Sequence, residues 1–85
     1  MTPINQCGDQ TRGGALPACE CVWICARGGT RLCCQLRNHS KDDVEIEVVR
    51  NGRLYGTYRF VERVAAIIFA TRLRLTFEGN GWITA

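Results

Sequence analysis

The residues with the clearest capacity for chemistry are six cysteines in a chain of only 85 residues. They are Cys7, Cys19, Cys21, Cys25, Cys33 and Cys34. A structural zinc ion needs four ligands that converge tetrahedrally, usually from paired C-x2–4-C knuckles or from cysteine and histidine pairs. From Cys19 onward the spacing is C-x-C-x3-C-x7-C-C, which contains no C-x-x-C pair. The adjacent Cys33 and Cys34 would also point to opposite faces of a strand.

Three interpretations of the cysteines stay open. They are ordinary thiols that behave as small hydrophobic side chains, a disulfide from Cys25 to Cys33 or Cys34, or a zinc site. The zinc ligands would then come from Cys19, Cys21, Cys25, Cys33 and Cys34. The first residues have neither the basic region nor the apolar region of a signal peptide, which predicts a cytoplasmic protein, where disulfides are rare. We therefore expect free thiols and no cofactor.

Other catalytic groups are sparse. A cysteine nucleophile needs a histidine base, and the only histidine, His39, lies in the polar segment Asn38–Asp43. The neighbouring carboxylates Asp42 and Asp43 precede an apolar segment, where they are more typical of solvation or capping than of acid/base catalysis. No glycine-rich phosphate loop is present. The sequence predicts no catalytic residues and no enzyme.

The first part of the chain contains two predicted strands. Residues 1–17 are rich in glycine and proline and are expected to form a flexible tail. Cys19–Ala26 is rich in residues that favour strands, although Pro17 and Gly28 would also suit a short helix. Arg31–Arg37 alternates between apolar and polar side chains, as a strand with one buried face does.

A β-hairpin is predicted over Val44–Phe60, with its turn at Asn51-Gly52. A two-residue turn would pair Val49 with Leu54, and a three-residue loop with a bulge at Gly52 would pair Val49 with Arg53. The three-residue loop separates the apolar from the charged residues better, so it is favoured. It places one set on a single face: Val44, Ile46, Val48, Leu54, Gly56, Tyr58 and Phe60.

After this hairpin the pattern predicts a helix over Glu62–Phe77. Arg72–Phe77 also alternates with a period of two and could be a strand that turns into Trp82-Ile83. As a helix, the segment has two apolar stripes. One contains Val64, Ile67, Ile68, Thr71 and Leu75, and the other contains Ala66, Phe69, Ala70, Leu73 and Phe77.

Together these elements predict a single α+β domain over residues 18–85. It would be an antiparallel meander of three to four strands with one C-terminal helix on one face. A helix on a small sheet needs only one apolar stripe, so the other must be covered. We expect the stripe of Ala66, Phe69, Ala70, Leu73 and Phe77 to be a homodimer or protein-partner interface, unless the N-terminal segment with Trp23 folds over it.

Charge gives a weaker indication of nucleic-acid binding. The formal net charge is +3, and residues 1–43 carry five basic and four acidic side chains, against six and four in residues 44–85. Candidate contacts on the outer sheet face are Arg50, Arg53, Tyr55 and Arg59, but Glu45 and Glu47 lie beside them. The order strand, turn, Tyr-Gly-Thr-Tyr and helix over Val44–Leu73 resembles that of AP2-type and integrase-arm DNA-binding domains. That resemblance implies a sheet face that binds a DNA groove.

The longest apolar run, Val64–Ala70, has seven residues, whereas a membrane-spanning helix needs about 20, so no membrane partner is expected. The favoured hypothesis is a non-enzymatic interaction or regulatory protein that binds a protein partner. Its size is typical of small accessory proteins of bacteria, phages and mobile elements, including inhibitors. The alternatives are a nucleic-acid-binding module and a zinc-stabilised binding module.

Overall fold

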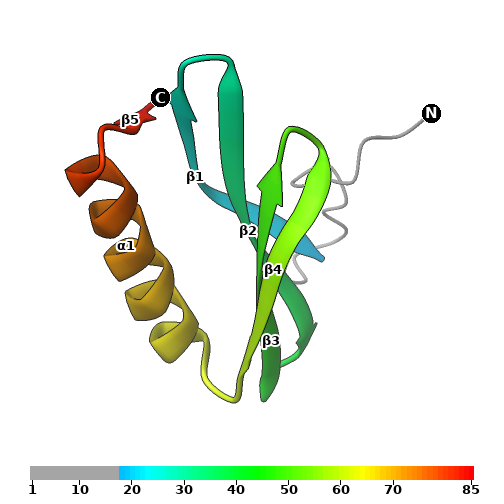
Figure 1. Ribbon diagram of the computed structural model, residues 1–85. Helices are drawn as coiled ribbons and strands as arrows, with labels where there is room; N and C mark the ends of the chain where they lie inside the picture. Colours follow the sequence, from blue (N-terminus) through cyan, green and yellow to red (C-terminus); the bar gives the residue numbers. More distant parts are fainter. Residues whose placement is uncertain (1–17) are drawn as a thin grey trace.

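The computed structural model describes residues 18–85, and the prediction of an N-terminal tail lies outside this range. The elements are β1 (Cys19–Arg27), β2 (Thr30–Ser40), β3 (Asp43–Arg50), β4 (Arg53–Phe60), α1 (Arg63–Gly79) and β5 (Ile83–Thr84). All strand pairs are antiparallel, in the order β4-β3-β2-β1-β5, and α1 lies across one face of the sheet (Figure 1). The predicted α+β class is confirmed. The expected three to four strands become five, because the chain turns after α1 and adds β5 beside β1.

A bulge in β1 determines which side chains face the helix. Cys21 pairs with Gln35, whereas Trp23 pairs with Cys34, so Val22 is the extra residue. An extra residue reverses the alternation of a strand. Cys21 and Trp23 therefore lie on opposite faces, and Trp23 is directed toward α1.

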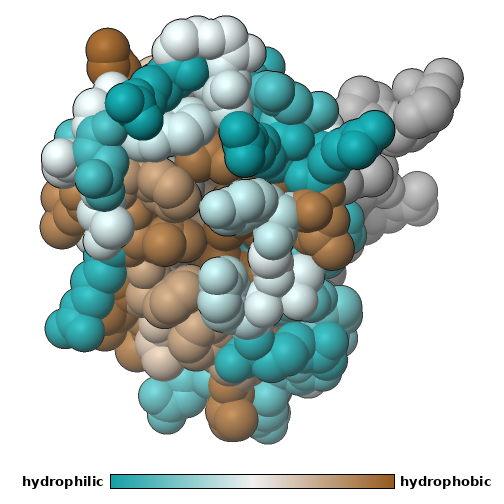
Figure 2. Space-filling model, viewed as in Figure 1, coloured by the Kyte–Doolittle hydropathy of each residue, from teal (hydrophilic) through white to brown (hydrophobic). Residues whose placement is uncertain are grey.

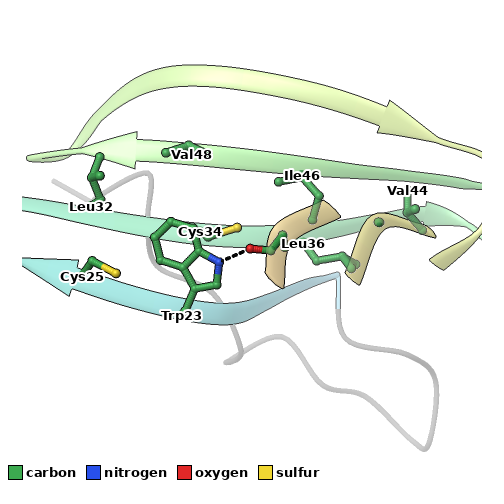
Figure 3. Close-up of a cluster of buried hydrophobic side chains, with 10 residues drawn as sticks. Trp23, Cys25, Leu32, Cys34, Leu36, Val44, Ile46 and Val48 are labelled. Atoms are coloured by element: carbon green, nitrogen blue, oxygen red, sulfur yellow. Dashed lines mark hydrogen bonds between the residues drawn. The ribbon is translucent and has the colours of Figure 1, made fainter. Parts of the chain in front are cut away.

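The core lies between the sheet and α1, and Figure 3 shows its main side chains. Its buried members are Trp23, Cys25, Leu32, Cys34, Leu36, Val44, Ile46, Val48, Ala66 and Ala70. The indole Nε1 of Trp23 donates a hydrogen bond to the carbonyl oxygen of Ala70 at 2.8 Å (Figure 3). A buried N–H without a partner is costly, so this bond fixes Trp23 against the helix.

The β3–β4 turn differs from the favoured prediction. It is a two-residue turn in which both Asn51 (φ 49°) and Gly52 (φ 83°) are left-handed, and Val49 pairs with Leu54. Asparagine tolerates this conformation well enough to form such a turn with glycine. The register then shifts between Val48 and Val49, which leaves Tyr55 as the extra residue. The shift returns most of the predicted face to the core side, but Leu54 lies on the opposite face.

α1 is helical throughout Arg63–Gly79, so the strand alternative for Arg72–Phe77 is wrong. Its two ends are attached to different parts of the sheet. Near the N-terminus Arg63 forms an ion pair with Glu20 of β1. Near the C-terminus the rings of Phe77 and Trp82 are 5.6 Å apart, just before β5.

Candidate functional site

The stripe expected to form an interface is the stripe that packs on the sheet. Ala66 and Ala70 are fully buried, and Phe69, Leu73 and Phe77 pack against the core cluster. The two alanines have no exposed surface that a partner could contact. The stripe expected to form an interface is therefore the one that packs on the sheet, and the stripe expected to pack on the sheet is the more exposed one. The physical reason is close packing. Small side chains at Ala66 and Ala70 let the helix backbone approach Trp23, while Phe69 contacts Tyr58 and Phe60 with ring centroids 4.7 and 5.4 Å away.

The opposite side of α1 is an exposed apolar row. Val64, Ile68 and Leu75 have 66, 49 and 55% of their surfaces exposed, and Val61 just before the helix is also exposed. Within α1, Val64, Ile68, Thr71 and Leu75 are spaced four, three and four residues apart, the pattern of the seam between two paired helices. We call Val61, Val64, Ile68, Thr71 and Leu75 the outward row. Figure 2 shows hydrophobic side chains along α1 and between α1 and β4.

The predicted nucleic-acid contacts separate into two groups. Arg59 forms ion pairs with Asp43 at 2.8 Å and Glu45 at 3.8 Å, and the hydrogen bonds to Asp43 raise the pKa of its guanidinium. Its charge is therefore compensated within the sheet. Arg50, Arg53 and Tyr55 instead line one shallow hollow at the β3–β4 turn, together with Asn51 and Leu54.

The acidic residues and the histidine of the β2–β3 region are engaged in the sheet. His39 Nε2 lies 2.9 Å from Glu45 Oε1, and Arg37 Nε donates to Glu47 Oε1 at 2.7 Å. The carboxylate of Asp43 accepts two hydrogen bonds from Arg59. These contacts are cross-strand charge pairs that stabilise the sheet.

The sheet divides the five described cysteines between its two faces. Cys25 and Cys34 lie in the core beneath α1, whereas the strand register places Cys19, Cys21 and Cys33 on the opposite face. Within residues 18–85, no group of three or more histidine, cysteine or acidic side chains could hold a metal ion. The proposed zinc set of Cys19, Cys21, Cys25, Cys33 and Cys34 therefore does not converge. Cys7 lies outside the described residues.

The cysteines instead make local polar contacts. Cys19 Sγ donates to Gln35 Oε1 at 3.1 Å, and the sulfur atoms of Cys21 and Cys33 are 4.0 Å apart. Cys25 pairs with Leu32, its sulfur lies 3.4 Å from Thr84 Oγ1, and the alternative of a disulfide from Cys25 to Cys33 or Cys34 is not formed. Burial, with smaller effects of neighbouring thiols, raises the pKa of Cys34 to about 12. This thiol is neutral and unreactive at physiological pH.

Two exposed arginines, Arg27 and Arg31, were not among the predicted contacts. They flank the β1–β2 turn, which lies at the same end of the sheet as the β3–β4 turn (Figure 1). The sequence contains a usable signal, because the turns Gly28-Gly29 and Asn51-Gly52 each have arginine within two residues on both sides. To recognise this signal one must know that the two hairpins lie side by side, with both turns at the same end of the sheet.

In the described part of the chain no helix is long and apolar enough to cross a membrane. Comparison of the chain with models of protein families, with curated proteins and with solved structures finds no match.

Proposed function

We propose that this chain is a non-enzymatic interaction protein that binds protein through the outward row of α1, and that its partner is a second copy of the chain. The observation that carries the proposal is the exposure of three aliphatic side chains at helix-seam spacing, Val64, Ile68 and Leu75, with the exposed Val61 just before the helix. Contiguous apolar surface of this kind on a small domain is typical of an interface.

The spacing favours a helix as the surface that covers the row. Side chains repeated at three and four residues stay on one side of a helix and fit between the side chains of a facing helix. All five members of the outward row are uncharged. A second α1 would therefore remove aliphatic surface from water on both chains.

Charge supports two copies packed antiparallel about Ile68. In that arrangement Val64 of one copy faces Thr71 of the second copy. Arg72 of the first copy lies at the same height along the helix axis as Val64 of the second copy. A helix rises about 1.5 Å per residue, so Arg72 comes within one turn of Glu62 of the second copy. Both side chains are exposed, and neither forms an ion pair within residues 18–85. Two-fold symmetry would form this pair twice.

The test is sedimentation velocity from about 5 to 500 µM, because so short a seam predicts a dissociation constant on the order of micromolar. We expect a dimer whose fraction rises with concentration. Ile68→Glu should remain monomeric. Ile83→Glu is the matched control, since Ile83 is 73% exposed but lies on β5, and it should associate like the wild type.

The orientation has its own test. Arg72→Glu and Glu62→Arg should each weaken the dimer, because each creates two like-charge pairs, and the double variant should restore it. A strictly monomeric wild type, or equal behaviour of Ile68→Glu and Ile83→Glu, would reject the proposal. A dimer that the double variant does not restore would reject the antiparallel arrangement.

A further inference from the structure

Four arginines from four strand ends meet at one end of the sheet. Arg27 pairs with Thr30 across the β1–β2 turn, next to the pair of Ala26 with Arg31. On the next strands Arg50 pairs with both Leu32 and Arg53. We call Arg27, Arg31, Arg50 and Arg53 the arginine end. Figure 2 shows strongly hydrophilic side chains over the two turns.

These positive charges are not compensated by nearby carboxylates. Neither turn has an acidic residue within residues 26–32 or 49–55. In the described part of the chain Arg37, Arg59, Arg63 and Arg74 form ion pairs, but none of the four arginines at this end does. Glu78, near β5, contacts Arg74 and Thr84. All four arginines are exposed, so their mutual repulsion would be relieved by a bound anion.

The arginine end is supported by a rigid connection between the two hairpins. The backbone N–H of Arg31 donates to Asn51 Oδ1 at 2.8 Å, and the N–H of Asn51 donates to the Arg31 carbonyl at 2.8 Å. This reciprocal pair ties β2 to the β3–β4 turn. The pair fixes the backbone of Arg31 relative to the turn that carries Arg50 and Arg53, while the strand register places the Arg31 side chain on the sheet face opposite to theirs.

The same end also carries an aromatic ring suited to a nucleobase. Tyr55 is 60% exposed and lines a hollow with Arg50 and Arg53. Guanidinium groups bind phosphate through paired N–H donors, and unpaired bases stack on exposed aromatic rings. An acidic protein would use the arginines but would leave the ring without a specific role.

We propose that the arginine end, together with Tyr55, binds single-stranded nucleic acid, with arginines on successive phosphates and a base on the tyrosine ring. Arg59 is excluded because its charge is held by Asp43 and Glu45. This site replaces the outer sheet face as the nucleic-acid interface. It is independent of the outward row.

The test uses fluorescence anisotropy of a fluorescein-labelled 12-nucleotide oligothymidylate in low salt. For four contacts, one for each arginine, we expect the slope of log affinity against log salt to be about −3, since each contact to a single strand contributes about −0.7. Arg31→Gln and Arg53→Gln should each weaken binding by about three- to tenfold and each reduce the slope by about 0.7. Arg59→Gln removes the same charge and should change affinity by less than twofold.

Tyr55→Ala distinguishes nucleic acid from other polyanions. It should weaken oligothymidylate binding by about tenfold, because the base loses its stacking on the tyrosine ring. Binding of inorganic polyphosphate should be unaffected. The proposal is overturned by absence of binding, by equal effects of Arg53→Gln and Arg59→Gln, or by polyglutamate competing as well as unlabelled oligothymidylate at equal charge. Sedimentation velocity of the same variants measures dimer formation independently, so a failure of nucleic-acid binding and a failure of dimerisation can be told apart.

Discussion

The core thiol of Cys34 makes the stability of the protein sensitive to alkaline pH. Burial raises the pKa of this thiol from its ordinary value of 9.0 to about 12. Between these values the unfolded chain loses the thiol proton and the folded chain keeps it. The contribution of Cys34 is therefore complete below pH 9 and is lost as pH rises toward 12, by about 1.4 kcal/mol per pH unit.

Urea unfolding of the wild type and Cys34→Ala at pH 8, 9.5 and 10.5 measures this effect. The variant should be less stable at pH 8, because it leaves a cavity, but its stability should fall less steeply as pH rises. The thiols of Cys21, Cys25 and Cys33 interact electrostatically with Cys34, so the difference between the two pH profiles reports Cys34 together with this coupling. Parallel pH profiles would contradict the assignment to Cys34.

The indole of Trp23 joins the sheet to the helix through one hydrogen bond. Trp23→Phe keeps an aromatic ring but removes the donor to the Ala70 carbonyl and part of the packing with Phe77, whose ring centroid is 6.0 Å away. We expect a loss of about 1–3 kcal/mol in the free energy of unfolding. Trp82→Phe is the control, since Trp82 is only partly buried. Equal losses for both variants would show that the bond to Ala70 is not important.

At the scale of elements, local patterns predict most of the fold but not its registers. Alternation and the Asn51-Gly52 pair predict the strands and hairpin, and a period near 3.6 residues predicts α1. The face of each strand also depends on bulges at Val22 and Tyr55, which follow from packing between strands. Single-strand patterns do not contain that information, so the three-residue loop was wrong although most of its inward face was right.

The two faces of α1 show a similar limit. Both stripes are apolar, and periodicity alone does not rank them. The choice depends on partners distant in sequence, because Trp23, Tyr58 and Phe60 offer aromatic surfaces that fit Phe69, Phe77 and the small alanines. The stripe with two alanines thus becomes the buried one, Ile67 of the other stripe also packs against the core, and Val64, Ile68 and Leu75 remain exposed.

The N-terminus of α1 lacks a side-chain cap. Glu62 occupies the cap position with extended backbone, and its side chain makes no capping hydrogen bond. Glu62→Asp keeps the charge and places a carboxylate where it can accept from the free backbone N–H groups. We expect a gain of about 0.5–1 kcal/mol in the free energy of unfolding, measured by urea titration at about 5 µM. Glu62→Ala should not raise the free energy of unfolding. If it raised this free energy as much as Glu62→Asp does, the capping hydrogen bond would not be the cause.

At the scale of the whole molecule, charge depends on topology rather than on composition. Counts along the sequence show an almost even distribution, and they conceal the arginine end because Arg27 and Arg53 are brought to one end only by two hairpins. The acidic residues of β3 are used internally by Arg37 and Arg59. Net charge therefore understates the local field, and strand order is needed to locate it.

Glu20 connects three elements and makes their association sensitive to acid. Its carboxylate accepts hydrogen bonds from Asn38 of β2 and Arg63 of α1. Burial alone would raise the pKa of Glu20, but the hydrogen bonds from Asn38 and Arg63 and the charge of Arg63 outweigh it, so the pKa is lowered from 4.5. Because the folded pKa is depressed, the stabilisation is complete above the unfolded pKa and is lost as pH falls through the folded value.

Glu20→Gln tests this connection with little change in shape. At pH 7 the variant should be less stable than the wild type by about 0.5–1 kcal/mol, the range expected for a partly exposed ion pair. The difference should shrink as pH falls through the pKa of the folded Glu20 carboxyl, because the wild-type side chain then becomes neutral as well. Glu47→Gln is a comparison at a carboxylate that binds Arg37 within the sheet, and it should leave the helix attached. Hydrogen exchange of the backbone amides in the first turn of α1 distinguishes the two variants. The exchange should accelerate in Glu20→Gln but not in Glu47→Gln. Unchanged exchange in Glu20→Gln would mean that Glu20 does not hold the helix to the sheet.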